Sequence, residues 1–105
     1  MSHDYKAQQA ETFASFEAFA AEAPSVATIS YQFYPEDVEP NWDGIEKALQ
    51  ARGFRTRRDE DDDLLDAEIG PVKISAALIW QHEKIATEIA LKFDFTPDGW
   101  GLLED

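Results

Sequence analysis

The sequence predicts one α+β domain, in which two helices cover one face of an antiparallel sheet. Of its 105 residues, 44% are hydrophobic and 12% are aromatic, which is enough apolar material for one modest core without metal or disulfides. The spacing of the apolar residues switches between the helical period and the period of two that is typical of strands. No linker, repeat or low-complexity segment divides the chain. We therefore expect a leading amphipathic helix in residues 1–23 and a single folded domain in residues 24–105.

The leading helix is predicted to begin at Asp4 and to end before Pro24. Its apolar stripe recurs at offsets of three and four residues and consists of Phe13, Phe16, Ala20 and Ala23. Such a stripe usually packs within its own domain, so we expect the helix to pack on the rest of the chain. Docking of this terminal helix on another protein is the alternative, because Tyr5 and Phe19 widen its aromatic face.

The first strand is predicted over residues 26–35, VATISYQFYP, where β-branched and aromatic residues alternate. One face is expected to point into the core and carries Ala27, Ile29, Tyr31 and Phe33. The other face carries Thr28, Ser30, Gln32 and Tyr34. We expect this second face to be either open or covered by the leading helix.

A helix and a hairpin are predicted after the proline-rich loop PEDVEP. Asn41 is the expected N-cap of the helix and Gly53 its expected C-cap. The inward positions of this helix are Trp42, Ile45, Ala48 and Leu49. Beyond it the period returns to two, so residues 54–58 and 65–69 are predicted as the strands of a hairpin whose turn is an acidic run. Pro71 is expected to interrupt the second strand.

Residues 75–93 carry the most regular helical pattern of the chain, with Leu78, Ile85 and Ile89 in line. The segment TPDG that follows is typical of a turn, after which a short final strand is expected. Beyond the leading helix the predicted order is strand, helix, strand, strand, helix, strand. This order is the βαββαβ arrangement of ferredoxin-like α/β sandwiches.

The charge of the chain restricts its function. Twenty-two Asp and Glu residues against nine Lys and Arg residues leave a net charge of -13, a field that repels nucleic-acid phosphates and attracts basic partners. Direct binding of DNA or RNA is therefore not expected. The chain has no Cys, no segment with the layout of a signal peptide and no apolar run long enough to span a membrane. These features predict a cytoplasmic protein.

The acidic run DEDDD superficially matches a calcium loop. Asp59, Asp61 and Asp63 stand where an EF-hand has its first ligands, but Leu64 and Gly70 occupy the positions that require Gly and Glu. An EF-hand is therefore excluded, and no metal site is predicted. The run is interpreted either as a solvated turn or as a surface that binds a partner.

Catalytic motifs are also incomplete. His82 begins a zincin-like helix motif, but the position of the required second histidine is occupied by Ala86. His82 is instead expected to be a hydrogen-bonded histidine at the edge of the core. The chain has no nucleophile elbow and no glycine-rich phosphate loop after a strand. No enzymatic activity and no cofactor are predicted.

The segment ALKFDFTPDGWG, residues 90–101, carries a resemblance to a known family. Together with ARGF at 51–54, the acidic hairpin and the leading MSHDY, it resembles the ribonuclease E inhibitor family, called regulator of ribonuclease activity B. The matching motif residues are Gly53, Phe54, Asp98, Gly99, Trp100 and Gly101. The resemblance covers most of the chain from Val26 onward, and the loop PEDVEP and the segment VKISAALIW depart from it. It implies a ferredoxin-like cytoplasmic protein that binds ribonuclease E, restrains RNA cleavage and catalyses nothing.

A binding mechanism consistent with this resemblance uses charge and one apolar anchor. An acidic domain can occupy an Arg-rich, RNA-binding segment of the nuclease in place of RNA. The acidic residues expected to supply the field are Asp59, Glu60, Asp61, Asp62, Asp63, Asp66 and Glu68. Trp80, or a partly exposed Phe of the first helix, is expected to be the anchor. The neighbouring arginines, Arg55, Arg57 and Arg58, are expected to restrain these acids.

Two other functions are compatible with the sequence. One is a small-molecule sensor or enzyme that uses the open sheet face of the same sandwich, because a fold does not fix a function. A polar pocket beside Tyr31 or Tyr34 would favour it. The other is an acidic mimic directed at a different basic protein, which only the identity of the partner distinguishes.

Overall fold

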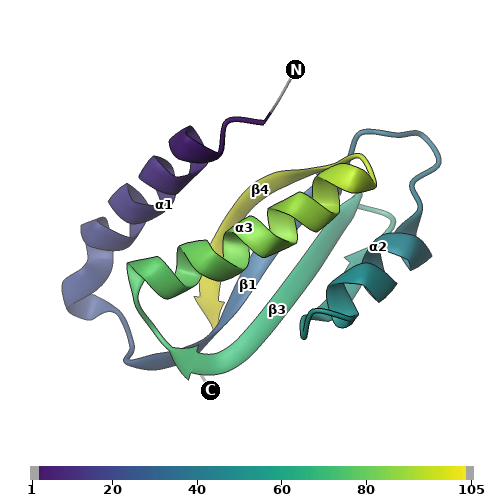
Figure 1. The fold of residues 1–105 in the computed structure, drawn as a ribbon. Coiled ribbons are helices and arrows are strands. Elements are labelled where there is room, and N and C mark those ends of the chain that lie inside the picture. The colour runs from purple at the N-terminus through teal and green to yellow at the C-terminus, as the bar shows by residue number, and fades with distance from the viewer. Residues whose placement is uncertain (1–2, 104–105) are drawn as a thin grey trace.

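The computed structural model describes residues 3–103, so residues 1–2 and 104–105, at the outer ends of the two predicted units, lie outside it. The described chain forms a compact α+β domain with three α-helices and one four-stranded antiparallel sheet, which confirms the predicted class (Figure 1). The elements in chain order are α1 (Tyr5–Phe19), a 3-10 helix η1 (Ala20–Glu22), β1 (Val26–Pro35), α2 (Trp42–Gln50), β2 (Arg55–Asp59), β3 (Leu64–Lys73), α3 (Ala76–Lys92) and β4 (Phe95–Leu103).

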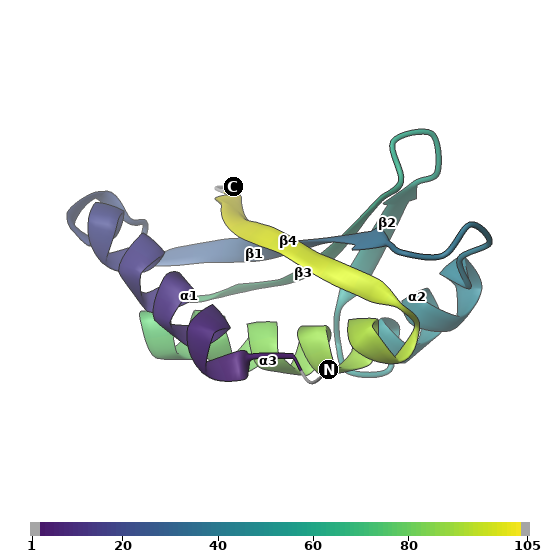
Figure 2. The ribbon, with the colours of Figure 1, turned by 90° about the horizontal axis from the view of Figure 1, so that it is seen from above.

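The strands lie in the order β2-β3-β1-β4, so β1 and β3 are central and β2 and β4 form the two edges. All three α-helices lie on one side of this sheet (Figures 1 and 2). α3 crosses the middle of that side, α1 lies next to α3 on the β4 side, and α2 lies on the β2 side. Among the described elements, none covers the opposite face. That face, which the sequence left undecided, is therefore not covered by a helix, although its residues Thr28 and Ser30 are buried.

The inward face of β1 forms the middle of the core, as predicted. Its four residues, Ala27, Ile29, Tyr31 and Phe33, are each at most 1% exposed. They pack against apolar side chains of β3 and of the helices, among them Leu65, Ala67, Ile45, Leu49, Ile79 and Ala86. The hydroxyl of Tyr31 donates a hydrogen bond of 2.7 Å to the carbonyl oxygen of Ile79. This bond satisfies a polar group that would otherwise be costly to bury.

The ends of α2 follow the predicted capping chemistry. The side chain of Asn41 accepts a hydrogen bond from a backbone amide in the first turn. At the other end Gly53 has φ +94, its amide donates to Gln50, and the amide of Phe54 donates to Leu49. These two bonds form a Schellman motif, in which Gly takes the left-handed position without a Cβ penalty. The predicted caps Asn41 and Gly53 are therefore confirmed.

The buried faces of α1 and α3 differ from the predicted stripes. In α3 the fully buried apolar positions are Ile79, Ala86 and Ala90, whereas Leu78 and Ile85 are only half-buried. In α1 the buried residues are Gln8 and Thr12, while the apolar stripe contributes mainly Phe16 and Ala20 is exposed. The reason is that α1 packs on the flank of α3. Both helices bury polar side chains there, and the spacing of apolar residues does not predict which polar residues are buried.

Pro71, predicted to interrupt a strand, and TPDG, predicted as a turn before a strand, both lie within strands. β3 continues past Pro71 to Lys73, with a register shift in the opposing strand between Ala27 and Ile29. β4 runs through TPDG, the expected turn, with Gly99 at φ +113 next to a second register shift against β1. Glycine at positive φ is typical of such bulges, which add a residue to one strand without ending the pairing.

Alanine at Gly70 should destabilise the protein more than alanine at Gly53. Both glycines have positive φ, +130 and +94, so each substitution strains the backbone by about 1 kcal/mol. At Gly70 a Cβ would also lie 2.9 Å from the carbonyl oxygen of Ala27, whereas at Gly53 no atom lies within 4 Å. We expect a loss in the free energy of unfolding of about 1 kcal/mol for Gly53→Ala and at least about 2 kcal/mol for Gly70→Ala, measured by urea unfolding. Equal losses would contradict the close packing at Gly70.

Candidate functional site

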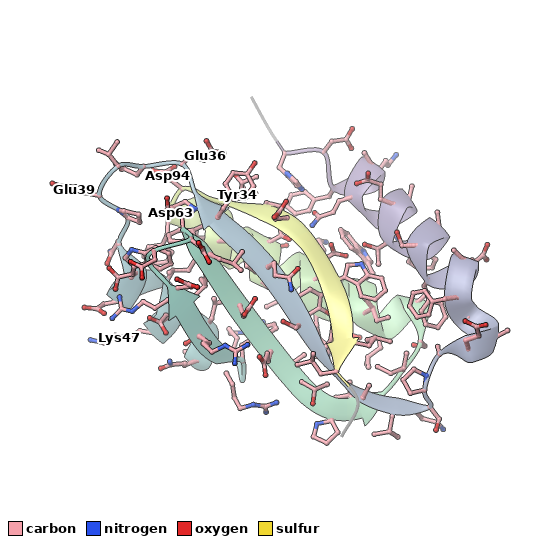
Figure 3. The ribbon with its side chains drawn as sticks, turned by 180° about the vertical axis from the view of Figure 1, so that it is seen from behind. Tyr34, Glu36, Glu39, Lys47, Asp63 and Asp94 are labelled. Carbon is pink, nitrogen blue, oxygen red and sulfur yellow. The ribbon has the colours of Figure 1, made fainter. Side chains whose placement is uncertain are left out.

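Three connections meet at one end of the sheet and gather negative charge there. β1 leaves the sheet at Pro35, which is paired with Phe95 at the start of β4, and Phe33 is paired with Leu65 beside the β2–β3 turn. Ten of the 22 acidic residues are exposed at this acidic end: Glu36, Asp37, Glu39, Asp43, Asp59, Glu60, Asp61, Asp62, Asp63 and Asp94. Figure 3 shows Glu36, Glu39, Asp63 and Asp94 together there. The predicted run 59–63 is thus one part of a larger surface.

Arg58 compensates only a little of this charge. Its guanidinium lies 3.1 Å from Asp43, 3.2 Å from Glu46 and 3.5 Å from Glu60. The arginine therefore links the β2–β3 hairpin to α2, and it restrains neighbouring acids as predicted. Because one cation is shared by three carboxylates, the acidic end retains a strongly negative field.

Asp66 and Glu68 lie within β3, on the sheet, rather than in the β2–β3 turn. Both point to the open face of β3, where Arg57 lies 3.5 Å from Asp66 and 4.0 Å from Glu68. One Asp66 oxygen is buried without a hydrogen-bond partner among residues 3–103. Arg55 donates instead to the carbonyl oxygen of Gly70, at 2.9 Å. Asp66 and Glu68 therefore form a partly compensated cluster on the sheet face, and Asp66 lines a pocket together with Asp59, Glu60 and Asp61 of the acidic end.

Trp80 is not brought to the acidic end. It is half-buried near the start of α3, whereas the acidic end lies beyond the other end of that helix. With a helical rise of about 1.5 Å per residue, about 20 Å of α3 separates Trp80 from Asp94. Trp80 and the acidic run therefore do not form one continuous surface, because α3 spans the length of the domain between them.

A buried polar cluster joins α1 to α3, and the sequence analysis did not find it. Glu83 is 5% exposed, and its carboxylate accepts hydrogen bonds from the Thr12 hydroxyl and the Gln8 side chain. Gln8 also donates to Thr87 at 2.9 Å and lies 2.7 Å from the ring of His3. A signal does exist in the sequence, because each helix places its two polar residues four positions apart, on one face.

Burial raises the pKa of the Glu83 carboxyl above its ordinary value, and the neighbouring charge of Glu11 acts in the same direction. The hydrogen bonds from Thr12 and Gln8 oppose this shift. Burial likewise lowers the pKa of His82, whose ring contacts Phe54 edge-on with centroids 6.3 Å apart. His82 is half-buried at the edge of the core, as predicted, but the side-chain hydrogen bonds within residues 3–103 do not include one to its ring.

A cleft of about 1130 Å³ lies between α1 and β4 and is called here the α1/β4 cleft. Glu83 lies in its wall with Gln8 and Thr12. The motif residues Gly99, Trp100 and Gly101 line the β4 side, and Asp98 is exposed beside them. Phe19 and Trp100 approach each other across the cleft, with ring centroids 6.1 Å apart. The other two motif residues, Gly53 and Phe54, lie at the end of α2 and serve in its cap.

The acidic residues do not converge on a metal. Across residues 3–103, no three Asp, Glu or His side chains lie close enough together to hold an ion. None of the helices in this part of the chain has the length and apolar character needed to cross a membrane. Within residues 3–103, the arrangement at the acidic end is an extended field of separate carboxylates.

Comparison with known proteins does not identify the chain. No protein-family model matches it, and a search of curated proteins found no significant match. The resemblance to the ribonuclease E inhibitor family thus remains a prediction. Its motif residues have structural roles here: Gly53 and Phe54 cap α2, and Gly99 occupies the β4 bulge.

The stability of the protein should depend on pH through Glu83. Its raised pKa means that the folded state binds this proton more tightly than the unfolded state, so the group stabilises the fold at low pH and loses that contribution as pH rises through the raised pKa. We expect the free energy of unfolding of the wild type, relative to Glu83→Gln, to increase as pH falls from about 7.5 to about 5. His3, Glu11 and Tyr31 are the titratable groups near it.

The matched control is Glu88→Gln, which removes an exposed carboxylate from the same helix. Urea unfolding of the three proteins at each pH separates the effect of burial from the general loss of negative charge. An equal pH dependence for the Glu83 and Glu88 variants would show that burial of Glu83 contributes nothing.

Proposed function

We propose that this protein is a non-enzymatic acidic regulator that binds an Arg-rich segment of an RNA-processing enzyme and restrains RNA cleavage. The observation that carries the proposal is the acidic end, where three connections gather ten exposed carboxylates and Arg58 pairs with only two of them, Asp43 and Glu60. Ribonuclease E is the partner that the family resemblance implies, and the cytoplasm is the compartment in which the two would meet. The strand order β2-β3-β1-β4 with two crossing helices supports a ferredoxin-like sandwich.

The physical basis is competition between carboxylates and RNA phosphates for the same arginines. Exposed ion pairs contribute only about 0 to 1 kcal/mol each, so no single acid would hold the partner. A field of several kT instead raises the association rate and orients the encounter. The turn at 59–63 projects from the sheet on a hairpin, which presents its charges to a partner with little obstruction (Figure 2).

The environment of these acids favours binding over catalysis. General acid–base chemistry requires titratable groups whose pKa values are driven apart by contrasting surroundings. The carboxylates of the acidic end share one exposed setting. The described carboxylate whose pKa is raised, that of Glu83, lies between α1 and α3, in contact with Gln8 and Thr12.

The sheet-face alternative lacks a supporting observation. Tyr31 points into the core and bonds to Ile79, so it does not line the open face. Tyr34 is on the open face and is 38% exposed. The large cleft in the described part of the chain lies between α1 and β4 rather than on this face. The acidic mimic of another basic protein differs from the main proposal only in its partner.

Reversing charge at the hairpin turn should weaken binding to the Arg-rich segment of ribonuclease E. The double variant Asp61→Lys, Asp62→Lys is compared with Glu17→Lys, Glu22→Lys, which changes the net charge equally at exposed positions in α1 and η1. We expect the hairpin variant to bind about tenfold more weakly and the control to bind within about threefold of the wild type, measured by fluorescence anisotropy. Wild-type affinity should also fall at least about tenfold between about 50 mM and about 200 mM salt.

The same proteins are then added to a ribonuclease E cleavage reaction. The wild type and the control should slow cleavage, and the hairpin variant should slow it less. Equal weakening by both double variants would mean that only net charge matters, and an absence of binding by the wild type would exclude ribonuclease E as the partner.

A further inference from the structure

We propose that the α1/β4 cleft is a docking groove for an extended, basic peptide, which adds to the sheet as a strand beside β4. This inference rests on the proposed function and identifies where the basic segment of the partner continues after the acidic end. The inference rests on two features that face each other across the cleft. One is the unpaired edge of β4, and the other is α1, which contributes acidic side chains to the cleft but no Lys or Arg.

The first wall of the groove is the free edge of β4. Since β4 is outermost in the sheet, about half of its backbone amides and carbonyls point away from β1. The regular part of this edge, Trp100–Leu103, is a template for an incoming strand, whose backbone supplies the affinity while alternate side chains supply the specificity, whereas Pro97 and the bulge at Gly99 interrupt the edge nearer Phe95. β4 has nine residues, Phe95–Leu103, and the described cleft follows it from Thr96 to Leu103.

The second wall selects a basic occupant. The side chains of α1 and α3 that line the cleft include the carboxylates of Asp4, Glu11 and Glu83, and among the described lining residues there is no Lys or Arg. His3 is the one side chain there that can carry positive charge. Asp4 and Glu11 are exposed, so a guanidinium or ammonium group in the cleft would meet their carboxylates.

The other free edge of the sheet has the opposite character. β2 has only five residues, and three of them are Arg55, Arg57 and Arg58. β2 offers fewer backbone positions to an incoming strand, whereas the nine residues of β4, FTPDGWGLL, contain one acidic and no basic residue. Charge therefore distinguishes the two edges and favours β4.

Size and continuity also suit a peptide. A volume of about 1130 Å³ exceeds the range of about 300–1,000 Å³ typical of small-molecule sites. Phe19, Trp100 and Leu102 supply apolar surface for alternate side chains of the strand. Where the cleft approaches the acidic end, it is lined by Thr96, whose hydroxyl donates a 2.7 Å hydrogen bond to Glu36. A segment bound at the acidic end can therefore enter the cleft without leaving negatively charged surface.

A second copy of this chain is a poorer occupant. Each copy carries a net charge of -13, so two acidic surfaces would repel each other at the cleft. The face of α1 toward the cleft is also largely polar, with Gln8, Glu11, Thr12 and Ser15.

The test uses the full chain and a fluorescein-labelled peptide of nine residues, the length of β4, in which arginine and valine alternate. Two control peptides carry glutamate in place of arginine, or N-methyl groups on the alternate amides that would face β4. We expect the arginine peptide to bind, the glutamate peptide not to bind, and N-methylation to weaken binding at least about tenfold. Amide hydrogen exchange should slow at least about tenfold in residues 96–103 and remain unchanged in β2.

The matched variants are Glu11→Lys and Glu17→Lys. Both residues are exposed glutamates of α1, but only Glu11 lines the cleft. We expect Glu11→Lys to weaken binding of the arginine peptide about fivefold and Glu17→Lys to weaken it less than twofold. Equal effects of the two variants would overturn the groove.

The remaining outcomes distinguish this inference from the proposed function. Protection confined to the acidic end would overturn the groove and leave the proposed function intact. If argininamide alone binds as tightly as the peptide, or if sedimentation shows that binding requires a dimer of this chain, the strand-addition proposal is wrong. Failure of both the arginine peptide and the ribonuclease E segment to bind would overturn both proposals.

Discussion

The central position of β1 is the constraint on which the rest of the structure depends. β1 pairs with β3 on one side and β4 on the other, and its inward side chains form the middle of the core. A shift of one residue in either register would exchange the two faces of the strand, so burial of Ile29, Tyr31 and Phe33 fixes both pairings. The same registers bring the loop after β1, the β2–β3 turn and the start of β4 to one end. The acidic end is thus a consequence of core packing.

The sheet separates two groups of charged side chains, one at the acidic end and one on the open face. The hairpin turn and the two neighbouring connections collect carboxylates that Arg58 only partly compensates, whereas Asp66 and Glu68 on the open face lie beside Arg57. A domain of this size can tolerate such concentrated repulsion because the acids are exposed, where water and salt screen them. The concentration of negative charge at the acidic end therefore costs the fold little.

The leading helix is held by a polar interface rather than by the apolar stripe alone. Glu83 accepts hydrogen bonds from Gln8 and Thr12, and Phe16 packs against the core. Removing one member of such a buried network leaves its partners unsatisfied, so the contact fixes one position for α1. In that position α1 packs against α3 and leaves the edge of β4 free. One interface thus attaches the helix and keeps the cleft open.

The sequence by itself determined the α+β class, the inward face of β1, the caps Asn41 and Gly53 and the alternation of the hairpin, because each depends on the period of side chains or on local backbone chemistry. Only the tertiary structure decided that Gly99 occupies a bulge within β4, that Trp80 lies far from the acidic turn, and that Glu83 is buried against α1. These features depend on which segments meet across the sheet and on which flank of α3 the leading helix rests. Such contacts join residues far apart in the chain, so the spacing within one helix can mark a polar face but does not say which segment packs against it.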